Sequence, residues 1–240
     1  MNLLAFDTST DVMSIAVQRG GGARDGTGAA PQVWLHTAAG GAQASSTLIP
    51  AIQQLMHHAG LAFGQLAAIA FGRGPGSFTG LRTACSVAQG LAFGAGVPVL
   101  PIGSLLAVAE EARYQKGMTA HFRVLALLDA RMNEVYAGYY EYNSMIWKQD
   151  RGYSLNLPEN LVLEAGWAIA GNAFAAYSDR LPSTDAVRIP ALPTASAMLR
   201  LAPALMAAGL ALPADQALPV YVRDKVAKTT QERLLEKAAA

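Results

Sequence analysis

A glycine-rich turn between a predicted strand and a predicted helix constrains this chain most. The apolar run 66–71 predicts a buried strand, and apolar residues at helical spacing predict a helix over 81–93. The turn 72–80 carries four glycines and a proline, which restrict its backbone to unusual dihedral angles. A turn at this place allows an anion or another backbone segment to come close to the helix N-terminus. The alternative is a tight turn with no further role.

Three familiar motifs of this kind are excluded. A P-loop needs a lysine in the turn, but the first lysine of the chain is Lys116. A dinucleotide-binding fold needs an acidic residue ~20 positions further on, and the stretch 97–106 has none. A nucleophile elbow needs glycines two residues either side of its serine, whereas Ser77 has Pro75 and Thr79 there.

The turn resembles the signature of the TsaB (YeaZ) family, whose members take part in forming N6-threonylcarbamoyladenosine in bacterial tRNA. The matching residues are Gly74, Pro75, Gly76, Ser77, Phe78, Thr79, Gly80, Leu81 and Arg82. Three further segments resemble the family's other motifs: Leu3–Thr10, Asp129–Tyr136 and Pro219–Arg223. Together the matches reach from residue 3 to residue 223. The glycine-rich stretch Gly20–Ala30 departs from the pattern and predicts an enlarged hairpin turn.

The order of predicted elements indicates an α/β fold with a mixed sheet. In the first half we expect strands at 2–6, 13–19, 32–38, 66–71 and 97–100, and helices at 46–59, at 81–93 and from 104 onward. In the second half we expect strands at 124–129, 134–142 and 167–170, and a helix at 195–208. The resemblance implies two actin-like (ASKHA, ribonuclease H-like) domains, of which the second is reduced.

We therefore expect a complete domain over 1–105, a reduced one over 106–222 and a charged tail over 223–240. The last helix of the second domain can pack back on the first. Charged residues make up only 15% of the chain, and the net charge of +1 gives no signal for binding a polyanion. The single cysteine, Cys85, lies on the apolar helix face and predicts core packing in a reducing, cytoplasmic setting. We expect no signal peptide and no membrane span.

The loop Asp7-Thr8-Ser9-Thr10 follows the first predicted strand. In actin-like ATPases a loop here holds phosphate and a magnesium-bound acid, so these residues are candidates for a remnant phosphate loop. The alternative is a turn whose side chains bond the local backbone. An ATPase would also need a second phosphate loop and an adenosine motif. The candidates are Asp129-Ala130-Arg131 and Ala170-Gly171-Asn172-Ala173, both short of glycines.

The histidines and tyrosines give weaker signals. His57 and His58 are adjacent on a predicted helix and point about 100° apart, so they do not converge on a metal. The catalytic relative TsaD is expected to hold its metal with a histidine pair on the equivalent helix, and this chain has no such pair. Four tyrosines lie in one segment with the period of a strand, so that its two faces share them: Tyr136, Tyr139, Tyr140 and Tyr142. We interpret them as hairpin packing rather than a platform for nucleic-acid bases.

A second face of the helix over 81–93 carries small residues at helical spacing. They are Thr83, Val87, Gly90 and Gly94. Small side chains allow close helix–helix approach, and the resemblance implies that this helix and helix 46–59 dock on TsaD or on a second copy. We place Leu48 and Ile52 in the same interface. The alternative is that both helix faces are covered within the chain.

The leading hypothesis is a non-catalytic subunit that scaffolds and activates a TsaD-type transferase, with a TsaE-type ATPase in the same complex. The resemblance implies that tRNA is met only through this complex, that ATP and a metal belong to the partner subunits, and that the chain alone forms a homodimer. We assign no catalytic residue, metal ligand or cofactor to this chain. An independent ATPase or kinase-like enzyme of the same fold is the alternative. A peptidase is a third hypothesis, which lacks a metal-binding histidine pair and a nucleophile constellation.

Overall fold

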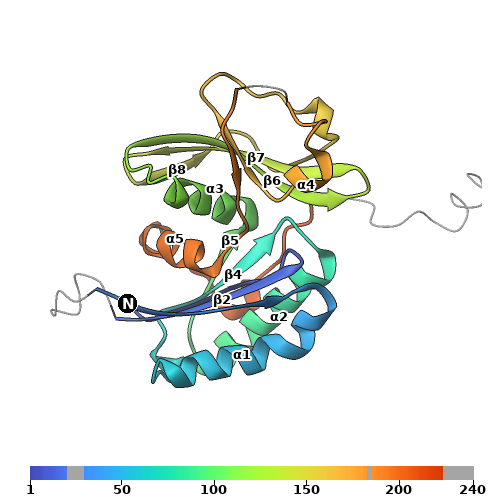
Figure 1. The fold of residues 1–240 in the computed structure, drawn as a ribbon. Coiled ribbons are helices and arrows are strands. Elements are labelled where there is room, and N and C mark those ends of the chain that lie inside the picture. The colour runs from blue at the N-terminus through green and yellow to red at the C-terminus, as the bar shows by residue number, and fades with distance from the viewer. Residues whose placement is uncertain (21–29, 183–184, 224–240) are drawn as a thin grey trace, which may run out of the picture.

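The computed structural model describes residues 1–20, 30–182 and 185–223. The expected hairpin enlargement within 20–30 and nearly all of the expected charged tail therefore lie outside the described residues. In the described part the chain forms two β-sheets with helices below and between them (Figure 1). Both sheets combine parallel and antiparallel strands, as expected for the predicted mixed α/β fold.

The first sheet has the strand order β3-β2-β1-β4-β5. Its strands are β1 (Leu3–Asp7), β2 (Val12–Arg19), β3 (Gln32–Ala39), β4 (Ala68–Gly74) and β5 (Val99–Gly103). The first three form an antiparallel meander, and β4 and β5 run parallel to β1. Helix α1 (Ala44–His58) connects β3 to β4, helix α2 (Phe78–Ala95) connects β4 to β5, and α3 (Ser104–Gln115) follows β5.

The second sheet has the order β11-β10-β6-β7-β8, with β9 paired to β7. Its strands are β6 (His121–Arg131), β7 (Glu134–Asn143), β8 (Ile146–Gln149), β9 (Ser154–Asn156), β10 (Ala168–Gly171) and β11 (Arg188–Pro190). The helices of this half are α4 (Phe174–Tyr177) and α5 (Ala195–Ala207). Short 3-10 turns lie at Gly41–Gln43, Phe63–Gln65, Pro158–Asn160 and Ala214–Gln216.

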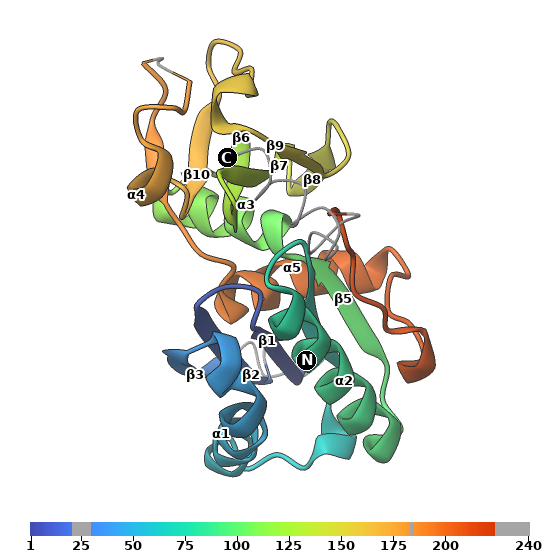
Figure 2. The same ribbon diagram turned by 90° about the vertical axis from the view of Figure 1, so that its right-hand side faces the viewer.

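The elements stack in layers, with α1 and α2 under the first sheet and α3 and α5 between the two sheets (Figures 1 and 2). Because side chains alternate along a strand, the central strand β1 serves both neighbouring layers. Leu4 and Phe6 pack toward α1 and α2, whereas Leu3 and Ala5 pack toward α5. All of β1 is buried as a result, which explains its continuous apolar sequence.

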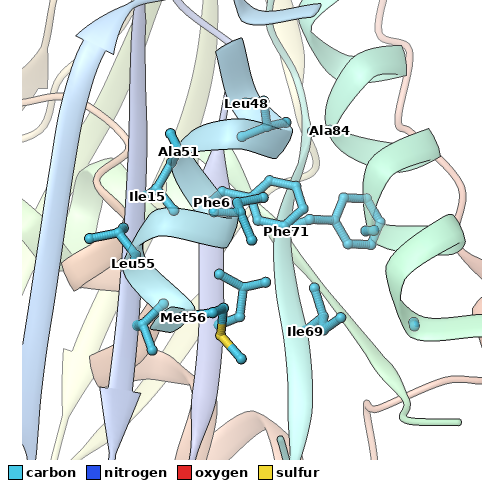
Figure 3. Close-up of a cluster of buried hydrophobic side chains, with 14 of the residues drawn as sticks. Phe6, Ile15, Leu48, Ala51, Leu55, Met56, Ile69, Phe71 and Ala84 are labelled. Atoms are coloured by element: carbon cyan, nitrogen blue, oxygen red, sulfur yellow. The ribbon is translucent and has the colours of Figure 1, made fainter. Parts of the chain in front are cut away.

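The core beneath the first sheet is filled by aromatic and branched side chains. Phe6 of β1 and Phe71 of β4 lie together, with Leu48 of α1 and Ala84 of α2 against them (Figure 3). Cys85 belongs to this cluster and is 5% exposed, so its predicted core packing is confirmed. Three of the four tyrosines of β7, at 136, 140 and 142, are buried in the core between α3 and the second sheet. Their predicted role in hairpin packing is confirmed.

The middle layer contains a buried charge cluster that connects α3, α5 and β8. Glu110 is 2% exposed and accepts hydrogen bonds from Arg113 at 2.8 Å, Arg200 at 2.9 Å and the Trp147 indole at 3.0 Å. Burial raises the pKa of Glu110, but the hydrogen bonds and charge of Arg113 outweigh it and bring the pKa below its usual value. α3 packs on elements of both halves, so the boundary predicted after residue 105 stays a prediction.

Most predicted elements are confirmed, with shifted ends. The expected loop 72–80 is wrong at both ends, because β4 runs on to Gly74 and α2 begins at Phe78. Ser77 causes the early helix start, since its side chain caps the helix by accepting from the Gly80 amide. Strands β8, β9 and β11 and the short helix α4 were not predicted.

Candidate functional site

The carboxylate of Asp7 is enclosed at the end of β1. It is 0% exposed and accepts three hydrogen bonds, from the Ser9 amide at 2.7 Å, the Ser9 hydroxyl at 2.6 Å and the Ser104 hydroxyl at 2.9 Å. Burial raises the pKa of Asp7 to about 6, although the hydrogen bonds from Ser9 and Ser104 act in the opposite direction. The only charged group of this loop therefore faces protein donors.

The hydroxyls beside Asp7 are also bonded within the chain. Thr8 donates to the carbonyl oxygen of Gly80 at 2.7 Å, and the Thr10 hydroxyl bonds the backbone of Val12. Sequence reasoning left two interpretations of residues 7–10, a remnant phosphate loop and a locally bonded turn. The described side-chain contacts are made to the chain itself, but Ser9 and Thr10 also line an open cavity, so the remnant phosphate loop stays a prediction.

The signature turn packs directly on this loop. A Cβ atom at Gly80 would lie 1.8 Å from the carbonyl oxygen of Thr8, and one at Gly76 would lie 2.5 Å from the Ser9 side chain. The Ser77 amide donates to the Ser9 carbonyl at 2.8 Å. The glycines therefore serve the close approach of two backbones, which was one of the two predicted roles of the turn.

Past the turn, exposed side chains at the start of α2 meet the C-terminal segment. Tyr221 packs on Phe78 with the rings tilted and their centroids 5.3 Å apart, and the Arg82 guanidinium lies 3.8 Å from the Phe78 ring centroid. The Arg82 Nε donates to the Tyr221 hydroxyl at 3.1 Å. The Val220 amide continues the contact by donating to the Arg73 carbonyl at 2.6 Å. Two segments matched by the resemblance thus touch each other.

The segment Asp129–Arg131 approaches from the second sheet. Asp129 accepts from the Tyr177 hydroxyl at 2.9 Å and from the Arg131 amide at 2.7 Å. Its own amide donates to the Asn172 side chain at 2.9 Å, which joins the two segments that the ATPase alternative had named as candidates. Arg131 forms an ion pair with Asp11, the residue that follows the loop 7–10. This ion pair connects the two halves of the chain.

The C-terminal segment closes the arrangement. Arg223 donates to the Ala130 carbonyl at 3.2 Å and pairs with Glu134. A cavity of about 270 Å³ remains between the four segments. Its walls include Ser9, Gly76, Phe78, Asp129, Tyr221 and Arg223. All four segments that carry the resemblance therefore line one cavity between the two halves, a convergence that sequence order alone did not predict.

The predicted partner surface needs one correction. Leu48 and Ile52 are 0% exposed in the core under the first sheet, so neither can contact a partner. Ser45 is instead the exposed residue of α1 that lies next to α2, and Ile49 is exposed elsewhere on the helix surface. Both predicted residues belong to the apolar stripe of α1, and that stripe faces the chain's own sheet.

The outer face of α2 is open. A Cβ atom at Gly90 or Gly94 would have no atom within 4 Å beyond the backbone of its own helix, while Thr83 and Val87 are half-buried. Phe93 lies on the same face and is 83% exposed, which sequence reasoning missed. The available signal was its position off the buried stripe of α2, where an apolar ring has no core to enter.

No group of three or more histidine, cysteine or acidic side chains suited to a metal occurs among the described residues. His57 and His58 are exposed, with their rings in an edge contact at 6.1 Å. Within residues 1–20, 30–182 and 185–223, no helix has both the length and the apolar character needed to cross a membrane.

Comparison with known proteins shows which fold and which family model the chain matches. Residues 30–239 match the family model described as TsaD, tRNA N6-adenosine threonylcarbamoyltransferase. The solved structure of YeaZ from Pseudomonas aeruginosa superposes with a TM-score of 0.79 at 36% identity, covering 92% of this chain and 99% of that one. The protein is thus a two-sheet α/β protein with the fold of YeaZ, and it matches the family model of the tRNA threonylcarbamoyltransferases.

Named relatives define the family more narrowly. The tRNA threonylcarbamoyladenosine biosynthesis protein TsaB of Escherichia coli K12 is 34% identical over 236 residues, which is 95% of this chain and 96% of the relative. TsaB of Haemophilus influenzae is 34% identical over 239 residues, with 94% and 95% covered. The chain belongs to the TsaB (YeaZ) family, and the predicted resemblance is confirmed.

Proposed function

We propose that this chain is a non-catalytic subunit that docks on a TsaD-type transferase and supports its transfer of a threonylcarbamoyl group to tRNA adenosine. The observation that carries the proposal is the outer face of α2, where an 83%-exposed phenylalanine stands beside two glycines with open space above them. An exposed aromatic ring next to bare backbone suits the centre of a protein interface. We propose the same face for the homodimer, so the two assemblies compete.

The Asp7 loop supports the non-catalytic part of the proposal. A phosphate-binding loop needs free hydroxyl or amide donors and an acid with open coordination positions. Here the Asp7 carboxylate is 0% exposed and the donors of Ser9 and Ser104 are directed at it. We propose that ATP and metal chemistry take place on TsaE-type and TsaD-type partners, that tRNA is reached through that assembly, and that the chain works in the cytoplasm.

The test is docking by matched glycine variants. Gly90→Glu places a charged side chain on the proposed interface, and Gly152→Glu places the same side chain at an exposed position with equal space around it. Loss of a central contact costs about 2 kcal/mol or more, so Gly90→Glu should weaken binding of the TsaD-type partner by at least ~30-fold. Gly152→Glu should bind as the parent does, and neither variant should melt below the parent, because Gly90→Glu gains helix propensity.

Binding would be measured by titration calorimetry with purified partner, and function by tRNA modification with TsaD-type and TsaE-type proteins present. Equal binding by the two glutamate variants would place the interface elsewhere. ATP turnover by the chain alone, lost in Asp7→Ala, would replace the scaffold proposal with the kinase-like alternative.

A further inference from the structure

A second hollow lies at the opposite edge of the second sheet from the cavity formed by the four matched segments. Strands β6, β10 and β11 run parallel, so their first residues meet at one edge. The end of α3 and the loop before β10 flank this edge, and together they enclose about 910 Å³. Ligands of open α/β sheets usually bind at the carboxyl ends of the strands, so this hollow is separate from the site of the fold. No residue lines both.

The floor of the hollow is apolar. Phe122, Trp167 and Ile189 line it. They are only 8%, 7% and 2% exposed, so most of each side chain is packed in the protein and a small edge faces the hollow. At its margin Met118 and Val187 are 39% and 55% exposed. A concave apolar surface with a few polar groups is the usual lining of a small-molecule site. The floor therefore suits an aromatic or branched aliphatic body.

The polar side chains of the hollow include hydrogen-bond donors, which favour a ligand with a hydrogen-bond acceptor. The Trp167 indole Nε1 is buried and has no hydrogen-bond partner among the described residues. Because this nitrogen has almost no accessible surface, Trp167 offers the hollow its ring rather than its N–H. The Arg123 guanidinium lies 5.8 Å from the Trp167 ring centroid and pairs with no described carboxylate. An anionic oxygen in the hollow would therefore find its partner in Arg123.

Charge at the rim points the same way. Lys116 and Arg123 line the hollow without an ion pair to a described residue, and His121 stands beside them. Of the two acids in the lining, Glu164 is engaged by Arg151 at 3.6 Å, which leaves Asp185. Among the described lining residues, cations without an ion pair thus outnumber such carboxylates, and the rim favours a negative group over a positive one.

We propose that this hollow binds a small organic anion with an aromatic or branched apolar body, whose acid group pairs with Arg123. The apolar body rests on Phe122 and Ile189. This inference does not depend on docking to a transferase, since the hollow and the outer face of α2 share no residue.

The probe is 8-anilinonaphthalene-1-sulfonate, which combines an aromatic body with a sulfonate. The chain has three tryptophans, so its indole N–H region in a nitrogen–proton correlation spectrum contains three signals. The Trp167 signal is assigned with Trp167→Phe or, if that variant is unfolded, by elimination with Trp34→Phe and Trp147→Phe. We expect a saturable shift of the Trp167 signal during titration, while the Trp34 and Trp147 signals stay in place.

Arg123→Gln removes the charge at the hollow, and Arg180→Gln is the matched control at an exposed arginine outside it. Loss of a charge-assisted hydrogen bond should raise the dissociation constant about tenfold in Arg123→Gln and leave it unchanged in Arg180→Gln. A Trp167 signal that does not move, or equal affinities of the two variants, would overturn the proposal. So would a shift produced by a glutamate-rich peptide and not by the sulfonate, because the occupant would then be a protein segment.

Discussion

The buried carboxylate of Asp7 lowers the stability of the protein near neutral pH. Its carboxylate is fully buried, and three donors do not offset the loss of hydration, so the pKa rises to about 6. A raised pKa means that the folded state binds the proton more tightly than the unfolded state. The contribution of Asp7 to stability is therefore full below pH ~4 and is lost as the pH rises through about 6.

Asp7→Asn should consequently be favoured over the parent as the pH rises. An asparagine can accept from the Ser9 donors with its oxygen and donate to Ser104 with its nitrogen. A shift of about two pKa units corresponds to roughly 3 kcal/mol, so the difference in unfolding free energy between variant and parent should move by that amount between pH 4 and pH 7.5. Urea unfolding at a series of pH values measures it. A difference that does not change with pH would contradict the assignment.

Gly80 makes a second prediction at this scale. A methyl group there would meet the Thr8 carbonyl oxygen at 1.8 Å, and backbone cannot move aside as a flexible side chain can. Gly80→Ala should destabilise the protein by about 2 kcal/mol or more, as overpacking does elsewhere. Gly94→Ala in the same helix has open space around it and should gain up to ~1 kcal/mol from helix propensity. Thermal melting compares the two. Similar losses of melting temperature in both variants would show that the cost arises from changing a glycine of helix α2 and not from the contact with Thr8.

At the scale of elements, long periodic segments were predictable and short ones were not. Helix α2 followed from its apolar stripe, but its true start at Phe78 depends on the Ser77 cap, which apolar spacing does not report. Strands β9 and β11 have three residues each, too few to show alternation. They form because longer neighbours, β7 and β10, offer them backbone partners.

The partner surface shows the same limit in another form. A stripe of apolar residues identifies a face of a helix but not what covers it. Leu48 and Ile52 were assigned to a partner although their own sheet buries them, whereas Phe93 was overlooked although it is exposed. The convergence of the four matched segments was likewise beyond sequence reasoning, because it depends on how the two halves pack.

At the scale of the whole molecule, the layer of α3 and α5 joins the two sheets through Glu110. Glu110→Ala would leave the mostly buried Arg113 and Arg200 without that partner, so we expect a loss of about 3 kcal/mol near neutral pH. The pKa of Glu110 is lowered, so its contribution is present above the usual glutamate pKa and is lost as the pH falls below it. The difference from the parent should therefore shrink in acid.

Calorimetry measures this change and also shows whether the sheets melt together. Since the layer packs on both, we expect a single transition in parent and variant. Glu159→Ala, which breaks an exposed pair with Arg180, is the control and should change the melting temperature little. Two separated transitions in the parent would show that the sheets are independent.

The place of α5 sets the order in which this protein can mature on the ribosome. The helix covers one face of the first sheet, yet residues 195–207 are synthesised long after that sheet's last strand, which ends at residue 103. The part of this face that α5 covers, which includes Leu3, therefore waits for the synthesis of more than ninety intervening residues, roughly 5–20 s at typical elongation rates. During this interval the nascent chain presents an apolar sheet face of the kind that chaperones recognise, and the chain buries it only once α5 has been made.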